Sequence, residues 1–430
     1  MYLCIDLKSF YASVECVERG LDPMTAMLAV ADPSRGPGGI CLAITPAMKA
    51  LGIKNRCRIF EIPKNVTYIT AVPRMRLYME YSARIYRTYL RYISPEDIYV
   101  YSVDECFIDI SQYTRLYHKT DREMTDFLLE AVRRETGLYA AAGIGTNLFL
   151  AKVALDVTAK HAADFVGFLD EETFKATIWH HRPITDIWNI GPGIARRLER
   201  LGIHDLYDVA HYEEKWLYKE FGVNAEFLID HAHGIEPCTI ADIHACTAKT
   251  KSISNSQILF EEYTAENALL VMKEMVDNLV LELVGRRLAA SSVWLSVGYA
   301  RDVIQPTGGS FRLREPTNSY RKIVAAFEAH FRKMVRANYP VKRLGIALCG
   351  LVDERNTGAT IDMFADTAAE EKERRLQEAV IGLRSRFGKN AVLKAMSYEE
   401  KATARMRNRL IGGHNAETLD GGTGDAVRRV

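Results

Sequence analysis

Two hydrophobic segments far apart in the sequence each end in acidic residues, and this feature constrains the fold most. Residues 2–6 end at Asp6, and residues 98–110 are interrupted by the pair Asp104-Glu105. Carboxylates at the ends or bends of paired strands can converge on one edge of a sheet, where three of them repel one another strongly. Oxygen ligands with open positions suit Mg²⁺. Two such ions about 3.5–4 Å apart could stabilise the attacking and leaving oxygens of a phosphoryl transfer, whereas solvated turn residues are the alternative explanation for the acids.

The order of predicted strands and helices divides the chain into several units. Residues 1–165 mix strands and helices, which is typical of an α+β layer. Residues 166–236 predict short helices and turns without strands. Residues 247–352 give the order βαββαβ of the split ferredoxin-like motif, with inward-facing residues alternating along a strand. We expect a linker at 237–246 and a polar C-terminal tail at 353–430.

Composition places the chain among globular proteins of the reducing cytoplasm. Hydrophobic residues make up 48% of the sequence, and no apolar run is long enough for a transmembrane helix. The apolar start carries Asp6 and Lys8, which argues against a signal peptide. Eight cysteines without a CxxC pair predict neither disulfides nor structural zinc. Net charge is only +1, yet residues 247–350 hold 15 basic against 9 acidic residues, so any surface for nucleic acid must be local.

Two glycine-containing turns are candidate phosphate sites. The Gly-Pro-Gly turn with Gly191 and Gly193, followed by Arg196 and Arg197, is typical of a helix–hairpin–helix. Its exposed backbone N–H groups would bind a DNA phosphate without reading sequence, although such a turn alone is more often an ordinary one. The segment 143–148 follows a strand and contains Gly-Ile-Gly, but the third glycine of a dinucleotide fingerprint is absent, so we reject that interpretation.

Several motifs, in order, resemble those of one known family. "MYLCIDLKSFYASVE" (1–15) and "YSVDECFIDI" (101–110) resemble the metal-binding motifs of the Y-family translesion DNA polymerases. The resemblance continues through "AMKALGI" (47–53), "GIGTNLFLAKVALD" (143–156) and "NIGPGIARRL" (189–198). The tail "RSRFGKNAVLKAMSYEEKATARMRNRLIGGH" resembles that of the bacterial UmuC-type branch, which includes DNA polymerases IV and V.

The resemblance implies a right-hand polymerase fold with an added domain. The implied activity is error-prone translesion synthesis in DNA repair and SOS-type mutagenesis, with deoxynucleotides added to a primer 3′ end by two-metal-ion transfer. The implied domains are a palm at 1–19 and 73–165, fingers at 20–72, a helical thumb at 166–236, the linker at 237–246, a ferredoxin-like little finger at 247–352, and a tail at 353–430 with a clamp-binding peptide.

The resemblance also implies roles for residues around the acids. The implied ligands of two Mg²⁺ ions are Asp6, Asp104, Glu105 and the backbone carbonyl of Leu7. Tyr11 matches the steric gate, whose ring lies under the incoming sugar and excludes a 2′-hydroxyl. Phe10 would support the base or sugar. Ordinary helix packing is the alternative explanation for both aromatic residues.

Two lysines match positions that contact the triphosphate in the family. Lys49 and Lys160 would neutralise charge on the phosphates, which is how cations assist such a transfer. Two departures bear on them. Thr45-Pro46 replaces a polar or aromatic residue of many relatives, and the spacing from Lys152 to Lys160 is one residue longer than in some relatives, which predicts a displaced Lys160. A solvated surface lysine is the alternative for each.

The remaining implied contacts involve DNA and protein partners. The expected partners are primer–template DNA, deoxynucleotides, a sliding clamp and a UmuD-like accessory subunit, with no membrane. Contacts to the DNA backbone are implied for Gly191, Gly193, Arg196, Arg197, Lys249, Lys251, Arg312 and Arg314. The clamp-binding peptide is implied for Ile361, Met363 and Phe364, although its first position lacks the usual glutamine. A plain anchor for the tail is the alternative.

Two other functions compete with polymerisation. A catalytically silent DNA-binding scaffold would not need the three acids together with Tyr11. A palm-type nucleotide cyclase would need neither the helix–hairpin–helix nor the basic domain at 247–352. Isolated acids are usually solvated turn residues, but the motifs that surround these acids argue against that interpretation.

Overall fold

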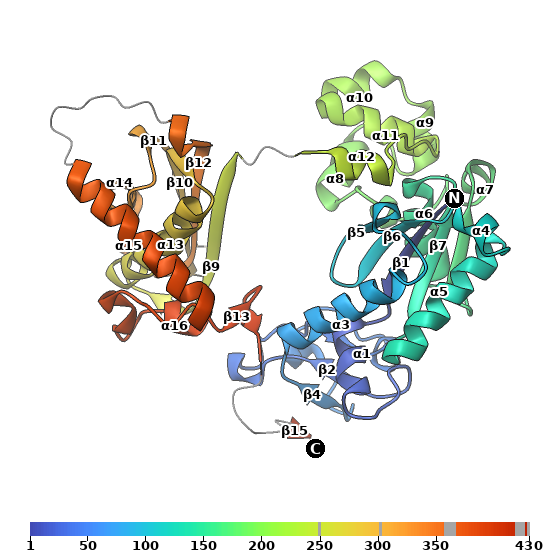
Figure 1. Cartoon of the computed structure of the whole chain (residues 1–430). Coiled ribbons are helices and arrows are strands. Elements are labelled where there is room, and N and C mark those ends of the chain that lie inside the picture. Colours follow the sequence, from blue (N-terminus) through green and yellow to red (C-terminus); the bar gives the residue numbers. More distant parts are fainter. Residues whose placement is uncertain (248–250, 301–302, 357–366, 418–425, 428–430) are drawn as a thin grey trace. The chain divides into compact units, whose positions relative to one another are not determined.

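The computed structural model describes residues 1–247, 251–300, 303–356, 367–417 and 426–427. The chain forms two compact units, of which the first comprises Met1–Thr247 with His414–Val430 and the second comprises Ala248–Gly413 (Figure 1). Within the described ranges, every helix is too short or too polar to span a bilayer.

A five-stranded sheet lies at the centre of the first unit, in the order β5-β6-β1-β7-β8. The middle strand β1 pairs antiparallel with both β6 and β7. Strands β1 and β7 read as nearly continuous apolar runs because helices cover both faces of the sheet. The strands are β1 (Tyr2–Leu7), β5 (Ile98–Val100), β6 (Glu105–Asp109), β7 (Ala140–Gly145) and β8 (Val166–Leu169).

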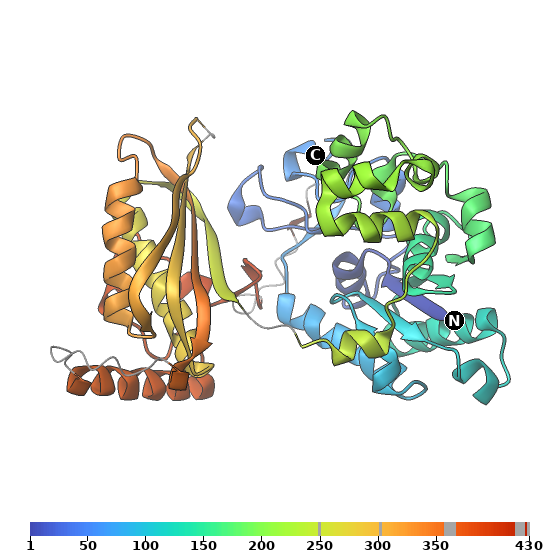
Figure 2. The ribbon, with the colours of Figure 1, turned by 90° about the horizontal axis from the view of Figure 1, so that it is seen from above.

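Different helices cover the two faces of this sheet. The helices α1 (Phe10–Val17), α3 (Met75–Tyr89) and α5 (Asp121–Thr136) pack on one face, next to the short α4 (Tyr113–Leu116). On the other face lie α6 (Leu148–Val153) and the π-helical turn η4 (Ala154–Ala159). Figure 2 shows the helices of this unit around its sheet.

Glycines let the second helical layer approach the sheet closely. A Cβ atom at Gly145 would lie 2.1 Å from the backbone nitrogen of Ala151, and one at Gly143 would lie 2.1 Å from the Ala151 carbonyl oxygen. On β8, a Cβ at Gly167 would lie 2.5 Å from the carbonyl oxygen of Ala154. The Gly-Ile-Gly segment therefore serves backbone packing.

A small sheet in the order β15-β4-β2-β3 forms the region between α1 and α3. Its edge strand β15 comes from the C-terminal end of the chain and pairs antiparallel with β4. The same returning segment caps α3, because the backbone N–H of Arg76 donates to the carbonyl of Ala416 (3.0 Å). The elements are β2 (Leu28–Val30), β3 (Ala43–Ile44), α2 (Pro46–Ala50), β4 (Ile69–Ala71) and β15 (Ala426–Val427).

The prediction that 166–236 contains no strand is wrong at its start, because β8 (Val166–Leu169) pairs with β7 at the edge of the central sheet. Short helices follow β8, as predicted. They surround a core that includes Phe174, Leu198 and Leu217. The helices are α7 (Glu171–Thr177), α8 (Pro192–Arg200), α9 (Leu206–His211), α10 (Glu214–Phe221) and α11 (Ala225–Ala232).

The segment 237–246, expected to be a linker, contains a helix, α12 (Ile240–Ala245). Thr239 and Asp242 form a capping box at its start, and Ile240 is buried against Phe107 of the central sheet. The segment is therefore helical at 240–245, where the capping box satisfies the first backbone N–H groups and Ile243 packs against the same cluster as Ile240.

The second unit has the predicted order βαββαβ. Its four strands form an antiparallel sheet in the order β11-β10-β12-β9, and α13 and α14 cover one face. The alternating residues Val293, Leu295 and Val297 of β10 are buried under these helices, as predicted. The elements are β9 (Ser252–Tyr263), α13 (Ala265–Gly285), β10 (Leu288–Tyr299), β11 (Thr307–Thr317), α14 (Tyr320–Met334) and β12 (Val341–Asp353).

The expectation of a polar tail is wrong for most of the segment that follows β12. A helix, α15 (Thr367–Phe387), forms there, and it belongs to the second unit together with α16 (Ala404–Arg407). One anchor of this segment is a buried carboxylate on α13, since Glu274 accepts backbone hydrogen bonds from Thr403 (2.8 Å) and Ala404 (3.1 Å). The short strands β13 (Leu410–Ile411) and β14 (His414–Asn415) follow.

The close approach at Gly145 generates a stability prediction. We expect Gly145→Ala to lower the free energy of unfolding of the first unit by about 3 kcal/mol, because the added methyl group would displace the α6 backbone. The matched control is Gly193→Ala, where no atom lies within 4 Å of the added Cβ. Denaturant unfolding of both variants checks this, and equal stability of the two variants would contradict it.

Candidate functional site

Strand pairing brings the three predicted acidic positions together. In the register of β1 and β6, Asp6 lies directly opposite Glu105. The backbone N–H of Leu7 donates to the carbonyl of Asp104 (3.0 Å), which fixes that residue beside the end of β1. Because side chains alternate along a strand, Asp6 and Glu105 point to the face covered by α6, together with Cys4.

Two lysines pair with these acids from the helical layer. The Lys152 Nζ lies 2.5 Å from Glu105 Oε1 and 3.0 Å from Asp156 Oδ2. The Lys160 Nζ lies 3.4 Å from Asp6 Oδ2 and 2.7 Å from Asp156 Oδ1. Sequence reasoning passed over Lys152 and Asp156 as partners of the acids. The signal was the spacing Lys-x₃-Asp-x₃-Lys, which places alternating charges on one helix face.

The π-helical turn η4 bears on the extra residue between Lys152 and Lys160. A π-helical turn accommodates one more residue than an α-helical turn, and such turns occur frequently at functional sites. The extra residue therefore does not remove Lys160 from the acids, because its ammonium group still reaches Asp6.

Burial and the neighbouring charges shift the pKa values of groups in this cluster. Burial raises the pKa of Asp6 from 3.8 to about 6; Lys160 opposes this shift, and the negative charges of Asp104 and Glu105 add to it. Burial lowers the pKa of Lys49. The negative charge of Asp6 opposes this shift, and the positive charge of Lys160 adds to it. The cluster therefore combines three acids with lysines from separate segments.

The donor set fits a hard divalent cation in its chemistry. Carboxylate oxygens are the ligands that Mg²⁺ takes from proteins, and Asp6, Asp104 and Glu105 supply them. Among the residues that the structure describes, however, no three acidic, histidine or cysteine side chains lie close enough together to hold an ion as they stand. Glu105 faces Lys152, and Asp104 accepts a hydrogen bond from the Ser102 hydroxyl (2.7 Å). Ion binding would require these carboxylates to turn from their present partners.

The two predicted aromatic residues lie at the start of α1. Phe10 is buried in the core of the first unit, whereas Tyr11 is half-buried. The Tyr11 ring stacks on that of Tyr78, with centroids 4.6 Å apart and 18° between the ring planes. Burial and then the charge of nearby Asp104 raise the pKa of the Tyr11 phenol. The structure thus brings the predicted gate position close to the acids.

The glycine turn at the start of α8 is open, but its two arginines differ. No atom lies within 4 Å of a Cβ built at Gly191 or Gly193, so the backbone there is accessible. Arg196 is exposed. Arg197 forms an ion pair with Glu220 (2.8 Å) and lies over the Phe221 ring, so its guanidinium group already has partners within the first unit.

In the second unit, the predicted basic residues are partly on the open face of the sheet. Arg312 and Arg314 are exposed on β11, and Lys251 is exposed next to β9. Trp294, which sequence reasoning did not single out, lies on the same face at the centre of the sheet and is 39% exposed. The predicted residues outside the described part of the chain are Lys249, Ile361, Met363 and Phe364.

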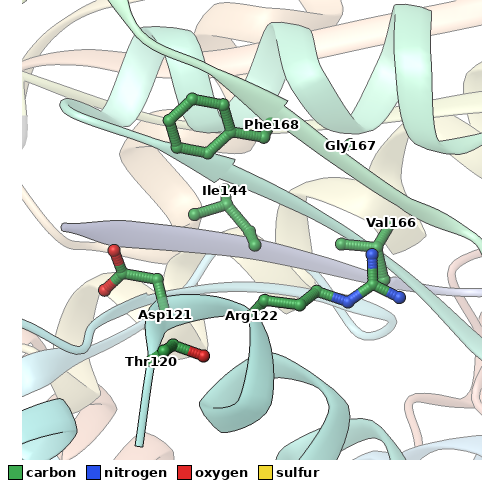
Figure 3. A pocket seen from close by; sticks show the side chains of 7 residues that line it. All are labelled: Thr120, Asp121, Arg122, Ile144, Val166, Gly167 and Phe168. Atoms are coloured by element: carbon green, nitrogen blue, oxygen red, sulfur yellow. The ribbon is translucent and has the colours of Figure 1, made fainter.

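A hollow of about 400 Å³ lies elsewhere on the first unit. Figure 3 shows that its lining comes from the start of α5 and from strands β7 and β8. Its charged residue Arg122 is engaged in ion pairs with Asp126 and Asp164 (2.9 Å each). Neither the acids nor the lysines described above line this hollow.

The raised pKa of Asp6 predicts a pH dependence of stability without metal. Between about pH 4 and pH 6 the folded protein binds more protons than the unfolded chain, so stability falls as pH rises through this window. In the presence of a chelator, we expect Asp6→Asn to be about 2 kcal/mol more stable than the parent above pH 6.

Denaturant unfolding of both proteins from pH 4 to pH 8 checks this dependence. The advantage of Asp6→Asn should develop between pH 4 and pH 6 and stay constant above. An advantage that does not change with pH would contradict the shift.

Comparisons with known proteins agree over nearly the whole chain. The impB/mucB/samB family model matches residues 5–156, and the model of the C-terminal domain of that family matches residues 250–363. The chain is 31% identical over 421 residues to the "Putative UV-damage repair protein UvrX" of Bacillus subtilis, covering 96% of this chain and 97% of that protein. It is 29% identical over 420 residues to "DNA polymerase IV 2" of the same organism, covering 95% and 97%.

A solved structure shares the fold. The Y-family DNA polymerase chimera Dbh-Dpo4(243-245)-Dbh matches with a TM-score of 0.63 at 20% identity, covering 82% of this chain and 99% of that one. The four-stranded sheet of the second unit corresponds to the little-finger domain of this fold. Together with the full-length identity above 30%, these matches show that the chain belongs to the impB/mucB/samB family of Y-family, DNA-directed DNA polymerases.

Proposed function

We propose that this polymerase performs error-prone translesion synthesis, adding deoxynucleotides to a primer 3′ end opposite damaged templates. The observation that carries the proposal is the register that sets Asp6 opposite Glu105, with Asp104 adjacent and lysines around them. A relative at 31% identity bears a name that refers to repair of UV damage, which supports a role in damage tolerance of the SOS type.

Two Mg²⁺ ions held by Asp6, Asp104, Glu105 and the carbonyl of Leu7 would activate the primer hydroxyl and stabilise the leaving pyrophosphate. Before ion binding, the lysines keep the repelling carboxylates together at the end of β1. Lys49 and Lys160 approach Asp6 from different segments, so both can contact the triphosphate that this charge cluster would receive. Their positive charge neutralises the phosphates.

The small region between α1 and α3 supports low fidelity. We assign the fingers to residues 20–72, whose sheet has strands of only two or three residues within this range. A finger domain of this size presses loosely on the nascent base pair, which admits damaged bases but reduces discrimination between bases. No exonuclease motif is apparent in the sequence, so we expect no proofreading.

The other domains and partners follow the same scheme. We assign the palm to 1–19 and 73–165, together with β8 of its sheet, and the thumb to the helices that follow β8 up to residue 236. The glycine turn of α8 and the open face of the little-finger sheet would bind the backbone of primer–template DNA, which is sequence-independent and sensitive to salt. We further propose that 361–364 bind a sliding clamp, that a UmuD-like subunit assists, and that the protein acts in the cytoplasm.

Primer extension on lesion-bearing templates tests the proposed activity. We expect extension past the lesion in Mg²⁺, and we expect Asp104→Ala to reduce it by at least about a thousandfold, because a metal-bound transition state is worth several kcal/mol. Asp109→Ala, at the other end of β6, is the matched control and should stay active. Full activity of Asp104→Ala would refute the metal assignment.

The gate role of Tyr11 makes a separate prediction. Tyr11→Ala should raise ribonucleotide incorporation relative to deoxynucleotide incorporation by at least about tenfold, because the side chain that clashes with the 2′-hydroxyl is removed. The ratio of kcat/KM for the two nucleotides, measured on one enzyme preparation, checks this. An unchanged ratio would show that Tyr11 does not select the sugar.

A further inference from the structure

A fully buried carboxylate lies behind the Tyr11 ring and takes no part in the acid cluster. Glu15 on α1 has no exposed surface. Arg74 binds it in a bidentate manner, with Nε 3.0 Å from Oε1 and Nη2 2.7 Å from Oε2. Arg19 pairs with Oε2 as well. Buried charges persist only where partners satisfy them, and here charged donors meet both carboxylate oxygens.

A further donor to this carboxylate is the residue that supports Tyr11. The Tyr78 hydroxyl donates to Glu15 Oε1 (2.7 Å), and the Tyr78 side chain is 1% exposed. The same residue also supports Tyr11, because the Tyr78 ring stacks nearly parallel on the Tyr11 ring. Burial and the charge of Glu15 raise the pKa of the Tyr78 phenol, so the hydroxyl stays protonated and able to donate.

The local sequence explains why these groups meet. Tyr11 and Glu15 are four residues apart on α1, and Arg74 and Tyr78 are four residues apart at the start of α3. Residues with this spacing share one face of a helix. The two helices therefore present two facing pairs, with an aromatic contact at one level and a charged contact at the other.

We propose that Glu15, acting through Tyr78, positions the Tyr11 ring and so contributes to the choice of deoxyribose over ribose. The proposal rests on the gate role of Tyr11 proposed above. A gate excludes a 2′-hydroxyl only if it does not yield when the larger sugar pushes against it. Tyr78 blocks such a movement because its hydroxyl is held by Glu15, which is itself held by Arg74. Glu15 and Tyr78 are positioning residues in this role.

Tyr78→Phe tests the proposal by removing a single oxygen atom. We expect the ratio of kcat/KM for a ribonucleotide to that for the matching deoxynucleotide to rise by roughly tenfold, the factor that one hydrogen bond is worth. A merely structural defect lowers the fraction of active enzyme for both nucleotides alike and leaves this ratio unchanged. The ratio therefore separates positioning from stability.

Tyr81→Phe is the matched control. Tyr81 lies on the same helix and is 3% exposed, and its hydroxyl donates to a different carboxylate, Glu18 Oε1 (2.7 Å). This variant also removes one buried hydroxyl from α3, but it leaves the contact between Tyr78 and Glu15 intact. We expect its sugar selectivity to equal that of the parent enzyme.

A second variant covers the case in which Tyr78→Phe does not fold. Arg74→Lys keeps the positive charge but cannot make the bidentate contact, and it should raise the same ratio to a smaller extent. Parental ratios in the variants that fold, alongside a raised ratio in Tyr11→Ala, would overturn the positioning role and leave the gate intact. A parental ratio in Tyr11→Ala would overturn both.

Discussion

The antiparallel pairing of β1 with β6 is the constraint on which the site depends. One register sets Asp6 opposite Glu105, and a slip by one residue would turn every side chain of β1 to the opposite face of the sheet. The register also concentrates negative charge where burial disfavours it, as the raised pKa of Asp6 shows. A fold that keeps this pairing needs cations close by, and Lys152 and Lys160 supply them.

The glycines of the central sheet serve the same purpose. Because Gly143, Gly145 and Gly167 have no side chains, α6 and η4 lie against the strands at backbone distance. Lys152 is therefore held against Glu105 in a buried position, where its side chain is 8% exposed. Sheet register and glycine packing together decide where the charges meet, which links the interior of the first unit to its chemistry.

The acids, the order βαββαβ and the fold family could be predicted because each leaves a local pattern in the sequence. The long-range contacts of Glu15 could not be predicted. Glu15 reads as one more polar residue on a helix until Arg74 and Tyr78, some sixty residues away, are seen to meet it. The prediction of a tail was wrong for the same reason: Glu274, which accepts a hydrogen bond from the Thr403 backbone, lies on α13, far away in sequence.

The return of the chain to its first unit has a topological consequence. Because residues 414–417 dock at the start of α3, where Ala416 accepts from the Arg76 N–H, the second unit is covalently joined to the first at both of its ends. It is an inserted body, not a pendant one. Exchange of this unit between related enzymes would therefore require two matched junctions.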